Sequence, residues 1–378
     1  MAEPIGVGML GAGFIGMIHS YALRSVTLAK TRPPLLPELV ALADLNAGAR
    51  ERCAERFGWS ETGDDWHAAV QDPRVGLFVN SAPNHLHLEP SLAAARLGKH
   101  VLCEKPLAPD AGTAFQLWRE TARTGVAHQC AFIFRFIPAL RLAREIVQSG
   151  QIGEVLQFRS SYLMSTALEP GQPMSWRFDR AVAGSGAIGD LGAHHIDQAR
   201  CLVGDIEAVS ALGKTQVPER GGRRVEVDDA FVSIVRFRNG AIGSIEGSRI
   251  ACGYGHTGRI QVDGTKGSLK FDVERLNELD IADGVNSGFR TIQAIRAGHP
   301  FADFMFDAGI QGSHPIGWAE CFVHQMHHFL TAAAGQGSVA PLAGTFEDGY
   351  RAAEVCDAMV RSWRSGQLEA VRYRSIDD

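Results

Sequence analysis

The stretch GMLGAGFIGMIHS, residues 8–20, decides the fold of the first third of the chain. An apolar run ends at Leu10, a helical pattern begins at Phe14, and glycines stand at positions 11, 13 and 16 between them. A GxGxxG arrangement between a strand and a helix lets the backbone turn sharply and approach a pyrophosphate. The stretch predicts a dinucleotide-binding turn rather than a tight turn without a ligand, and its contact residues are Gly11, Gly13, Phe14, Ile15 and Gly16.

An acidic residue follows at the end of the next apolar run. Asp44 in LVALADLN lies 28 residues beyond Gly16 rather than about 20, and the insertion TRPPLLP accounts for the excess. A carboxylate there accepts hydrogen bonds from the adenosine ribose hydroxyls and repels a 2′-phosphate, and neither Leu45 nor Asn46 supplies a cation to hold one. We therefore expect NAD rather than NADP. A second role for Asp44, as the cap of the helix NAGARERC, stays open.

Two patterns of elements divide the chain. Up to about residue 130, short apolar runs alternate with helical patterns, as expected for a parallel sheet with helices on both faces. After about residue 155 the strands are longer, and Asn239-Gly240 marks a hairpin. We predict the α/β class: a Rossmann domain over 1–130, and an α+β domain over 131–378 with a large, open, mostly antiparallel sheet. Helices are expected at 137–149, 190–203, 317–334 and 346–365, with loops at 31–37 and 295–316 and the C-terminal helix placed to return to the first domain.

Composition excludes several classes of protein. The 378 residues carry a formal net charge of -5, which disfavours a surface for nucleic acid or anionic membranes. No apolar run reaches the length of a membrane span, and the N-terminus enters a strand pattern without a leader peptide. The seven cysteines are odd in number and lack CxxC spacing, so neither a disulfide framework nor a zinc ribbon is expected. These features indicate a cytoplasmic protein.

Polar residues follow two further apolar runs. SAPNHLHLE, residues 81–89, is a proline turn with Asn84 and His87, and CEKP ends the next run with Glu104 and Lys105. The carboxyl ends of parallel strands form the ligand-binding edge of an open α/β sheet. A buried charged pair is tolerated there only when it is paired or used. The two motifs therefore predict that these residues face a ligand-binding cleft at this edge of the sheet.

In these motifs the chain resembles the Gfo/Idh/MocA family of NAD(P)-dependent oxidoreductases, whose signature includes the glycine turn, a TPNxxH-like turn and GKHVxxEKP. GSGAIGDLGAHHIDQARCLVG, residues 184–204, is similar to the family's GDxGxHxxD element. The closest likeness is to the branch of levoglucosan and inositol dehydrogenases. The resemblance implies a catalytic triad of Lys105, Asp190 and His194. It also implies cofactor contacts by Ala82, Pro83, Asn84, His87 and Glu104.

The residue chemistry agrees with that implication. Asp190 and His194 are spaced i,i+4, so a helix over this stretch presents both from one face. An imidazole aligned by a carboxylate suits the removal of a hydroxyl proton near neutral pH, and Lys105 can stabilise the developing negative charge. The structural alternative is an Asp that caps the helix and a His packed on the sheet. His195 points about 100° away and is the weaker candidate, and Asp197 supports the motif.

Substrate contacts are predicted from four residues: Arg135, Tyr162, Trp176 and Arg177. Arginine and tryptophan bind sugar hydroxyls and stack on pyranose faces, although both are also common structural residues. In the family, the corresponding stretch often carries polar residues at the positions that Ile133 and Phe134 occupy in this chain. CFVHQMHHF (321–329) has metal-ligand spacing. A helix that lines the domain interface explains the same residues, and hydride transfer needs no metal, so no metal is expected.

The expected activity is oxidation of a ring secondary hydroxyl of a cyclic polyol, sugar or anhydrosugar to a ketone, with hydride transfer to NAD. Two alternatives stay open. One is an NAD-dependent enzyme that cleaves glycosides through a transient oxidation, and the other is a non-catalytic dinucleotide-binding regulator. Alternating apolar residues in AFVSIVRF and AIGSIEGSRI predict that one sheet face forms a homo-oligomer, a tetramer or a dimer.

Overall fold

The computed structural model describes residues 2–29, 31–294 and 315–378, and the chain divides into two compact units. The first unit contains residues 2–108, 112–136 and the described residues of 302–350. The second contains residues 109–111, the described residues of 137–301, and 351–378. The segment 131–136 and the helix Trp318–Ala333 therefore belong with the first unit, and the predicted boundary after residue 130 stays a prediction.

The first unit is a doubly wound α/β layer structure. Its described strands form a six-stranded parallel sheet in the order β3-β2-β1-β4-β5-β6. The strands are β1 (Glu3–Leu10), β2 (Leu35–Ala43), β3 (Glu61–Gly63), β4 (Val75–Asn80), β5 (His100–Cys103) and β6 (His128–Cys130). The helices are α1 (Phe14–Ser25), α2 (Ala47–Phe57), α3 (Trp66–Gln71), α4 (Leu88–Arg96), α5 (Ala111–Ala122) and α9 (Trp318–Ala333), with short helices at Val26–Leu28, Asn84–Leu86 and Ile133–Phe136.

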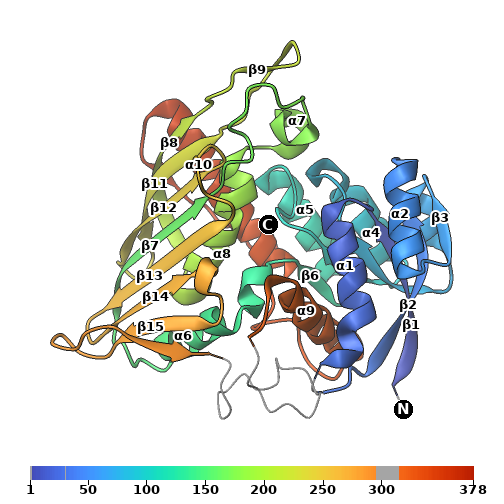
Figure 1. Ribbon diagram of the computed structural model, residues 1–378, viewed down its shortest axis with the longest axis horizontal. Coiled ribbons are helices and arrows are strands. Elements are labelled where there is room, and N and C mark those ends of the chain that lie inside the picture. The colour runs from blue at the N-terminus through green and yellow to red at the C-terminus, as the bar shows by residue number, and fades with distance from the viewer. Residues whose placement is uncertain (1, 30, 295–314) are drawn as a thin grey trace. The chain divides into compact units, whose positions relative to one another are not determined.

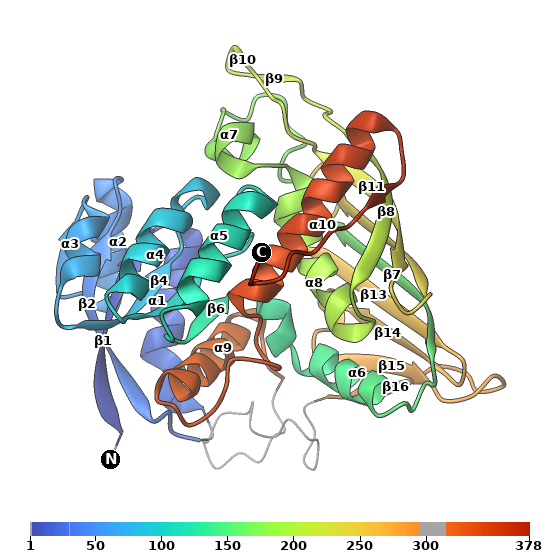
Figure 2. The same cartoon turned by 180° about the vertical axis from the view of Figure 1, so that it is seen from behind.

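Both faces of this sheet are covered. In Figure 1 helices α1 and α2 lie on the near side of the sheet, and in the reversed view of Figure 2 the near helices are α4 and α5. Helix α9 packs on α1 and contacts β2. The central strands are accordingly apolar along most of their length: Leu77, Phe78 and Val79 of β4 are each 0% exposed. This confirms the predicted Rossmann-type unit.

The second unit is built on a large open sheet. Its described strands run in the order β16-β15-β14-β13-β7-β12-β11-β8-β17, and only β7 and β12 pair in parallel. The strands are β7 (Val155–Leu163), β8 (Ile206–Lys214), β11 (Ala230–Phe237), β12 (Ile242–Ser248), β13 (Thr257–Gly264), β14 (Ser268–Asp272), β15 (Glu278–Ala282), β16 (Arg290–Gln293) and β17 (Glu369–Ala370), with a separate hairpin of β9 (Glu219–Arg220) and β10 (Arg223–Arg224). The mostly antiparallel sheet was predicted, and it is confirmed.

Helices cover one face of this sheet. They are α6 (Pro138–Gln148), α8 (Ala193–Leu202) and the second-unit part of α10 (Phe346–Ser365), as Figure 2 shows, with the short helices Trp176–Phe178, α7 (Arg180–Ala183) and Val273–Arg275 nearby in the chain. The opposite face keeps large apolar side chains exposed, among them Leu212, Val232 and Ile234. Strand β11 alternates buried and exposed residues along its length. The predicted hairpin at Asn239-Gly240 joins β11 to β12, where Gly240 has φ +90°.

The structure corrects some predicted boundaries. Strand β2 already begins at Leu35, inside the predicted loop 31–37, because Leu35 and Leu36 pair with β1. The predicted helix 190–203 starts earlier, as a π-helical turn at Ile188–Gly192, and becomes α-helical at Ala193. Helices α6, α9 and α10 match the predictions within one residue at each end. Most of the predicted loop 295–316 lies outside the described residues.

Candidate active site

The three glycines of the turn after β1 have three different surroundings. Gly11 has φ +99°, and a Cβ there would lie 2.6 Å from the carbonyl oxygen of Ser81. A Cβ on Gly16 would lie 2.0 Å from the carbonyl oxygen of Gly11, so this glycine lets helix α1 approach the turn. A Cβ on Gly13 would meet nothing within 4 Å. Gly13 is thus the open position, where a ligand can come close to the backbone.

The N-terminus of α1 is arranged for an anion. Gly13 is the residue before the helix, and no side chain caps the N–H groups of the first turn. Free N–H groups and the positive end of the helix dipole favour a phosphate at this point. The Phe14 ring turns aside and stacks on Trp318, with 6.0 Å between ring centroids. The residues present therefore fit the pyrophosphate of a dinucleotide, held by the backbone of 13–16.

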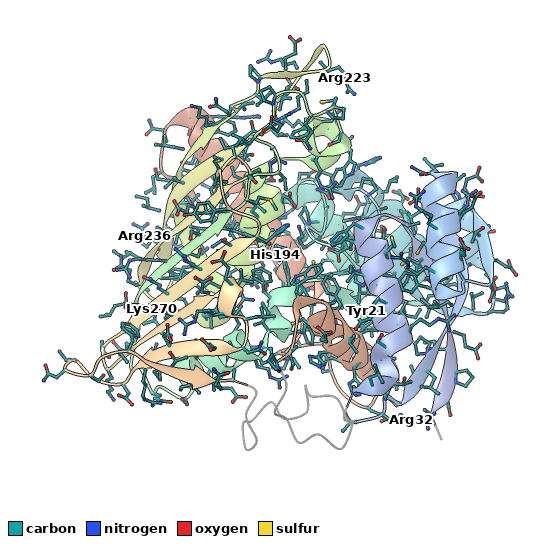
Figure 3. All side chains as sticks on the ribbon, in the orientation of Figure 1. Tyr21, Arg32, His194, Arg223, Arg236 and Lys270 are labelled. Atoms are coloured by element: carbon teal, nitrogen blue, oxygen red, sulfur yellow. The ribbon has the colours of Figure 1, made fainter. Side chains whose placement is uncertain are left out.

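A separate apolar hollow runs along the side of α1. It has a volume of about 470 Å³ and is lined by Phe14, Met17, Ile18, Tyr21, Arg56, Phe57 and Ala319. Tyr21 of this lining is labelled in Figure 3. The Phe14 side chain belongs to this hollow, so a cofactor contact by Phe14 would use its backbone.

Asp44 lies directly after β2 and faces the glycine turn. One carboxylate oxygen accepts the Ala12 N–H at 2.6 Å, and the other accepts the Asn46 N–H at 2.8 Å. The cap of α2 is Asn46, whose side chain accepts the Ala49 N–H. Asp44 is therefore not the helix cap, and its carboxylate joins the end of β2 to the turn. Its position is the one expected for a ribose ligand.

Arg50 also lies at this edge, and the sequence analysis missed it. Its guanidinium donates to the Asp44 carbonyl oxygen at 2.6 Å from the first turn of α2. Leu45 and Asn46, which directly follow Asp44, carry no positive charge for a 2′-phosphate, whereas Arg50 does. Helical periodicity places Arg50 one turn after Asn46 and could have identified it.

Two buried polar side chains, Asn80 and His87, hold the turn after β4 by hydrogen bonds. Asn80, which is completely buried, donates through its side-chain amide to the Leu86 carbonyl oxygen at 2.9 Å and to Ser91 Oγ at 3.0 Å. His87 is also fully buried; its Nε2 lies 2.9 Å from the Ala82 carbonyl oxygen and its Nδ1 lies 2.9 Å from that of Pro106. His87 therefore joins the proline turn to the segment that carries Lys105. A buried side chain of this kind supports the backbone of a cofactor site without contacting the cofactor itself.

Pro83 and Asn84 lie in the same turn. Pro83 precedes the short helix Asn84–Leu86 and is partly exposed, whereas Asn84 is 6% exposed. Ala82 donates its backbone N–H to the side-chain oxygen of Asn80 at 3.3 Å. The structure thus brings Ala82, Pro83 and Asn84 to the carboxyl end of β4, one strand from the glycine turn.

Glu104 and Lys105 directly follow strand β5. Glu104 is 7% exposed, and its Oε1 lies 2.8 Å from Nε2 of His19, a completely buried residue of α1. Its other oxygen, Oε2, accepts the backbone N–H of Lys105 at 3.0 Å. Lys105 itself is half-buried. His19 was not predicted as a site residue, although it stands one helical turn after Gly16 in the decisive stretch.

The second unit presents Asp190 and His194 at the start of α8. Asp190 lies in the π-helical turn Ile188–Gly192, and its N–H donates to the Gly186 carbonyl oxygen at 2.9 Å. His194 lies in the first turn of α8 and is 8% exposed; its place in the second unit is labelled in Figure 3. Helical turns that depart from the α pattern are frequent at functional sites.

The buried carboxylate of Asp228 anchors this turn. Its two oxygens accept the N–H groups of Gly186 and Ile188, each at 2.8 Å, and its backbone oxygen accepts the Ala187 N–H at 3.0 Å. Burial raises the pKa of Asp228. Residues 186–188 are therefore tied to the start of β11, about 40 positions later in the sequence. The sequence signal was the acidic pair directly before a β pattern.

Tyr162 of β7 lies among histidines. Its ring stacks on His195 at 5.4 Å between centroids and lies 6.1 Å from the ring of His194. Burial, with a further contribution from the negative charge of Asp190, raises the pKa of Tyr162 well above its usual range. Its hydroxyl lies 3.4 Å from Nδ1 of the exposed His256, a neighbour that the sequence did not suggest. Burial lowers the pKa of His195 to about 3, so this ring stays neutral.

The other predicted substrate residues are placed differently. Arg135 is buried in the first unit, where it pairs with Asp348 at 3.2 Å and donates to the Ala343 carbonyl oxygen at 3.1 Å. These contacts support the structural role that sequence left open. In the second unit, the guanidinium of the exposed Arg177 lies 4.4 Å from the ring centroid of Trp176. Trp176 itself is partly exposed.

Two histidines of the stretch CFVHQMHHF make structural contacts. His327 Nε2 lies 2.7 Å from the Thr31 carbonyl oxygen, and His328 Nε2 lies 3.0 Å from that of Val339. Over residues 2–29, 31–294 and 315–378, no three or more His, Cys, Asp or Glu side chains are grouped as a metal site requires. In the same residues no helix is both long and apolar enough to cross a membrane.

Two family models match the chain in sequence. Residues 5–132 match the oxidoreductase family with an NAD-binding Rossmann fold, and residues 140–270 match the GFO/IDH/MocA C-terminal domain. Together these matches span both units.

Individual relatives give the same result. The chain is 37% identical over 382 residues to a levoglucosan dehydrogenase of Pseudarthrobacter phenanthrenivorans, which covers 95% of this chain and 96% of the relative. It is 31% identical to a myo-inositol 2-dehydrogenase of Thermotoga maritima, over 73% of this chain and 78% of the relative. Its fold matches a levoglucosan dehydrogenase solved in complex with NADH and levoglucosan, with a TM-score of 0.93, 36% identity, and coverage of 98% of this chain and 100% of that one.

Proposed function

Because the chain belongs to the Gfo/Idh/MocA family of NAD-dependent oxidoreductases, we propose that it oxidises one ring secondary hydroxyl of an anhydrosugar or cyclic polyol to a ketone. Dehydrogenation of CH–OH groups with NAD is the activity of the class. The observation that supports an anhydrosugar most strongly is the likeness to levoglucosan dehydrogenase along 95% of the chain. Levoglucosan is therefore the first substrate to test.

In this proposal the first unit binds NAD. The backbone of 13–16 holds the pyrophosphate, and Asp44 holds the adenosine ribose. Bound NAD supplies the acceptor for the hydride that leaves the substrate carbon. Ala82, Pro83, Asn84 and Glu104 line the nicotinamide ribose, and His87 shapes the turn behind them.

Three residues handle the substrate hydroxyl. His194 takes its proton while the C–H bond breaks, because an imidazole can accept a proton near neutral pH. Asp190 orients and supports that imidazole. Lys105 stabilises the negative charge that develops on the oxygen. Tyr162, Trp176 and Arg177 contribute to the walls of the sugar site, whereas Arg135 acts structurally.

The decisive experiment is a substrate panel with the purified protein. Levoglucosan, inositols and free aldoses are incubated with NAD, and NADH absorbance is followed. We expect turnover of levoglucosan or a cyclic polyol above that of aldoses. Release of a free sugar from a glycoside without net NADH would support the glycoside-cleaving alternative. NAD binding without turnover of any polyol would support the regulator.

The triad is tested by single and paired substitutions. His194→Ala should lower kcat by about 10²–10⁴-fold and leave NAD affinity nearly unchanged, because His194 meets substrate and not dinucleotide. Asp190→Asn should fall between wild type and His194→Ala. If Lys105 and His194 act on one hydroxyl, the effects of Lys105→Ala and His194→Ala should be far less than multiplicative.

The pH profile assigns the proton acceptor. The rate of oxidation should rise with pH through one ionisation, and this limb should vanish in His194→Ala. If the limb survives there and disappears in a Lys105 variant, the lysine is the acceptor. NAD binding by each variant is measured first, as the control for a collapsed site.

Two further properties form part of the proposal. The exposed apolar face of the second-unit sheet supports a homo-oligomer, a tetramer or a dimer. None of the seven cysteines forms a disulfide, which supports a reducing cytoplasmic location.

A further inference from the structure

The segment that carries Lys105 is held on both sides by buried histidines. Before Lys105, the Glu104 carboxylate contacts His19 Nε2 at 2.8 Å; after it, the Pro106 carbonyl oxygen lies 2.9 Å from His87 Nδ1. Both imidazoles are 0% exposed. The two histidines come from different elements, α1 and the end of the turn after β4.

Glu104 uses each carboxylate oxygen for a different purpose. Oε1 meets His19, and Oε2 accepts the backbone N–H of Lys105 at 3.0 Å. The backbone N–H of Glu104 in turn donates to the Asn80 carbonyl oxygen at 2.9 Å. A carboxylate that accepts bonds on both oxygens and is 7% exposed cannot rotate without losing one of them. Fixing Oε1 therefore fixes the peptide of Lys105.

His19 is itself fixed. The edge of its ring packs against Phe322 of α9, with 5.4 Å between centroids and 78° between planes. It stands one turn after Gly16 on the helix whose N-terminus faces the cofactor turn. A single residue thus links the phosphate-binding helix to the catalytic lysine.

We propose that His19 is a positioning residue for catalysis, which holds Lys105 in register with the bound cofactor through Glu104. The inference rests on the proposed function, because it takes Lys105 as the catalytic lysine. Misplacing a catalytic group by about 1 Å can reduce the rate by about 10²-fold. The loss should fall on kcat, because the backbone that binds the pyrophosphate is unchanged.

The test compares four variants of the full chain. His19→Gln keeps an N–H donor that can reach Glu104, whereas His19→Asn is polar but too short, and His19→Leu removes the donor. His100→Leu is the matched control, since His100 lies at the opposite end of β5 from Lys105 and its Nδ1 accepts the Ala127 N–H. NAD affinity, kcat, KM and the thermal midpoint are measured for each.

We expect kcat to fall about 10–100-fold in His19→Leu and His19→Asn, with NAD affinity within about threefold of wild type. His19→Gln should recover most of the loss, and His100→Leu should keep kcat. Equal kcat in the Gln and Asn variants, or wild-type kcat in His19→Leu, would overturn the proposal. If His19→Leu does not fold, the Gln and Asn pair still decides the question.

A paired substitution separates positioning from general damage. In a Lys105→Arg background, His19→Leu should reduce kcat by less than about threefold further, because its effect passes through the lysine. A fully multiplicative loss would show that His19 acts elsewhere and would refute the inference. Wild-type kcat in Lys105→Arg and Lys105→Ala would instead refute the proposed role of Lys105. The two failures are therefore distinguishable.

Discussion

The three glycines of the turn after β1 are required for three different physical reasons. Gly11 is required for its positive φ, Gly16 for the close approach of α1, and Gly13 for the open space above it. The pattern GxGxxG indicated the ligand, but only the surroundings of each glycine separate these roles. Asp44 is a similar case, because its carboxylate already accepts two backbone N–H groups and is thereby aimed at the turn.

Cofactor preference should depend on Asp44. Asp44→Ser removes the charge that repels a 2′-phosphate and leaves Arg50 nearby, so the preference for NAD over NADP should narrow. Hydrogen bonds to charged groups are worth about 1.5–3 kcal/mol, so NAD affinity should fall about 10–100-fold. Fluorescence titration with both cofactors measures this.

The control for Asp44 is Asp65→Ser, at the exposed cap of α3 in the same unit. This variant should leave both cofactor affinities unchanged. Equal turnover with NADP and NAD by the wild-type protein would contradict the repulsion argument.

At the scale of elements, the π-helical turn before α8 depends on a partner far away in sequence. Residues 186–188 direct their N–H groups to Asp228, so the helix that carries Asp190 and His194 is oriented by the β-sheet. Gly186 is pressed against this anchor, since a Cβ there would lie 1.7 Å from the Asp228 carbonyl oxygen. The π-helical turn before α8 and Asp228 therefore pack tightly against each other.

Asp228→Asn should lower both stability and activity. An amide presents an NH₂ to one of the two N–H groups, so a buried donor loses its acceptor at a cost of about 1–3 kcal/mol. The turn then shifts and misplaces the catalytic groups that follow it. We therefore expect kcat to fall by more than about 10-fold. Urea unfolding and steady-state kinetics report the two effects.

The neighbouring Asp229 provides the matched control. It is equally buried, but its Oδ2 accepts the N–H groups of Gln216 and Val217, and its Oδ1 lies 3.4 Å from the Arg249 guanidinium. Asp229→Asn should therefore lose stability and keep most of its kcat. Equal losses of kcat in the two variants would exclude a specific role of Asp228.

At the scale of the whole molecule, one face of the large sheet has no cover within the described chain. Exposed apolar side chains on it come from three neighbouring strands, β8, β11 and β12: Leu212 (74% exposed), Val232 (55%), Ile234 (63%) and Ile242 (56%). Arg236 of β11, labelled in Figure 3, shares this face with Val232 and Ile234. A contiguous apolar patch of this kind is typical of a protein interface.

Ile234→Lys should dissociate the proposed oligomer. A charge at the centre of the patch is desolvated on assembly without a partner, which strongly disfavours association. Light scattering at micromolar concentration should show a smaller particle than wild type, while the matched surface change Leu97→Lys (57% exposed, first unit) should keep the wild-type mass. A monomeric wild-type protein would remove the basis of the interface.

Stability should fall in mild acid because of buried neutral histidines. Burial lowers the pKa of His195 and of His324 to about 3 each, whereas an unfolded histidine titrates near 6.5. Below about pH 6.5 the unfolded chain binds more protons, so the free energy of unfolding decreases as pH falls through this window. Above about pH 6.5 these histidines are neutral in both the folded and the unfolded chain, and they no longer lower the free energy of unfolding.

Urea unfolding between pH 7.5 and 4.5 tests this dependence. His195→Asn should reduce the slope of the unfolding free energy against pH by up to about 1.4 kcal/mol per unit, whatever its effect on absolute stability. Ile196→Val, a buried neighbour without a titratable group, should keep the wild-type slope. An unchanged slope in His195→Asn would show that this ring does not titrate on unfolding.

Local pattern was enough to determine the two classes of sheet, most helix positions, the glycine turn and the placement of Asp44, Glu104 and Lys105 at strand ends. These features follow from periodicity and turn chemistry, which act over a few residues. Only tertiary structure decided that His19 pairs with Glu104, that Asp228 anchors residues 186–188, and that Arg135 pairs with Asp348 in a structural role. Each of these contacts joins residues distant in sequence, and a buried polar group takes whichever partner the fold brings to it, because leaving it unpaired costs more than any local preference can offset.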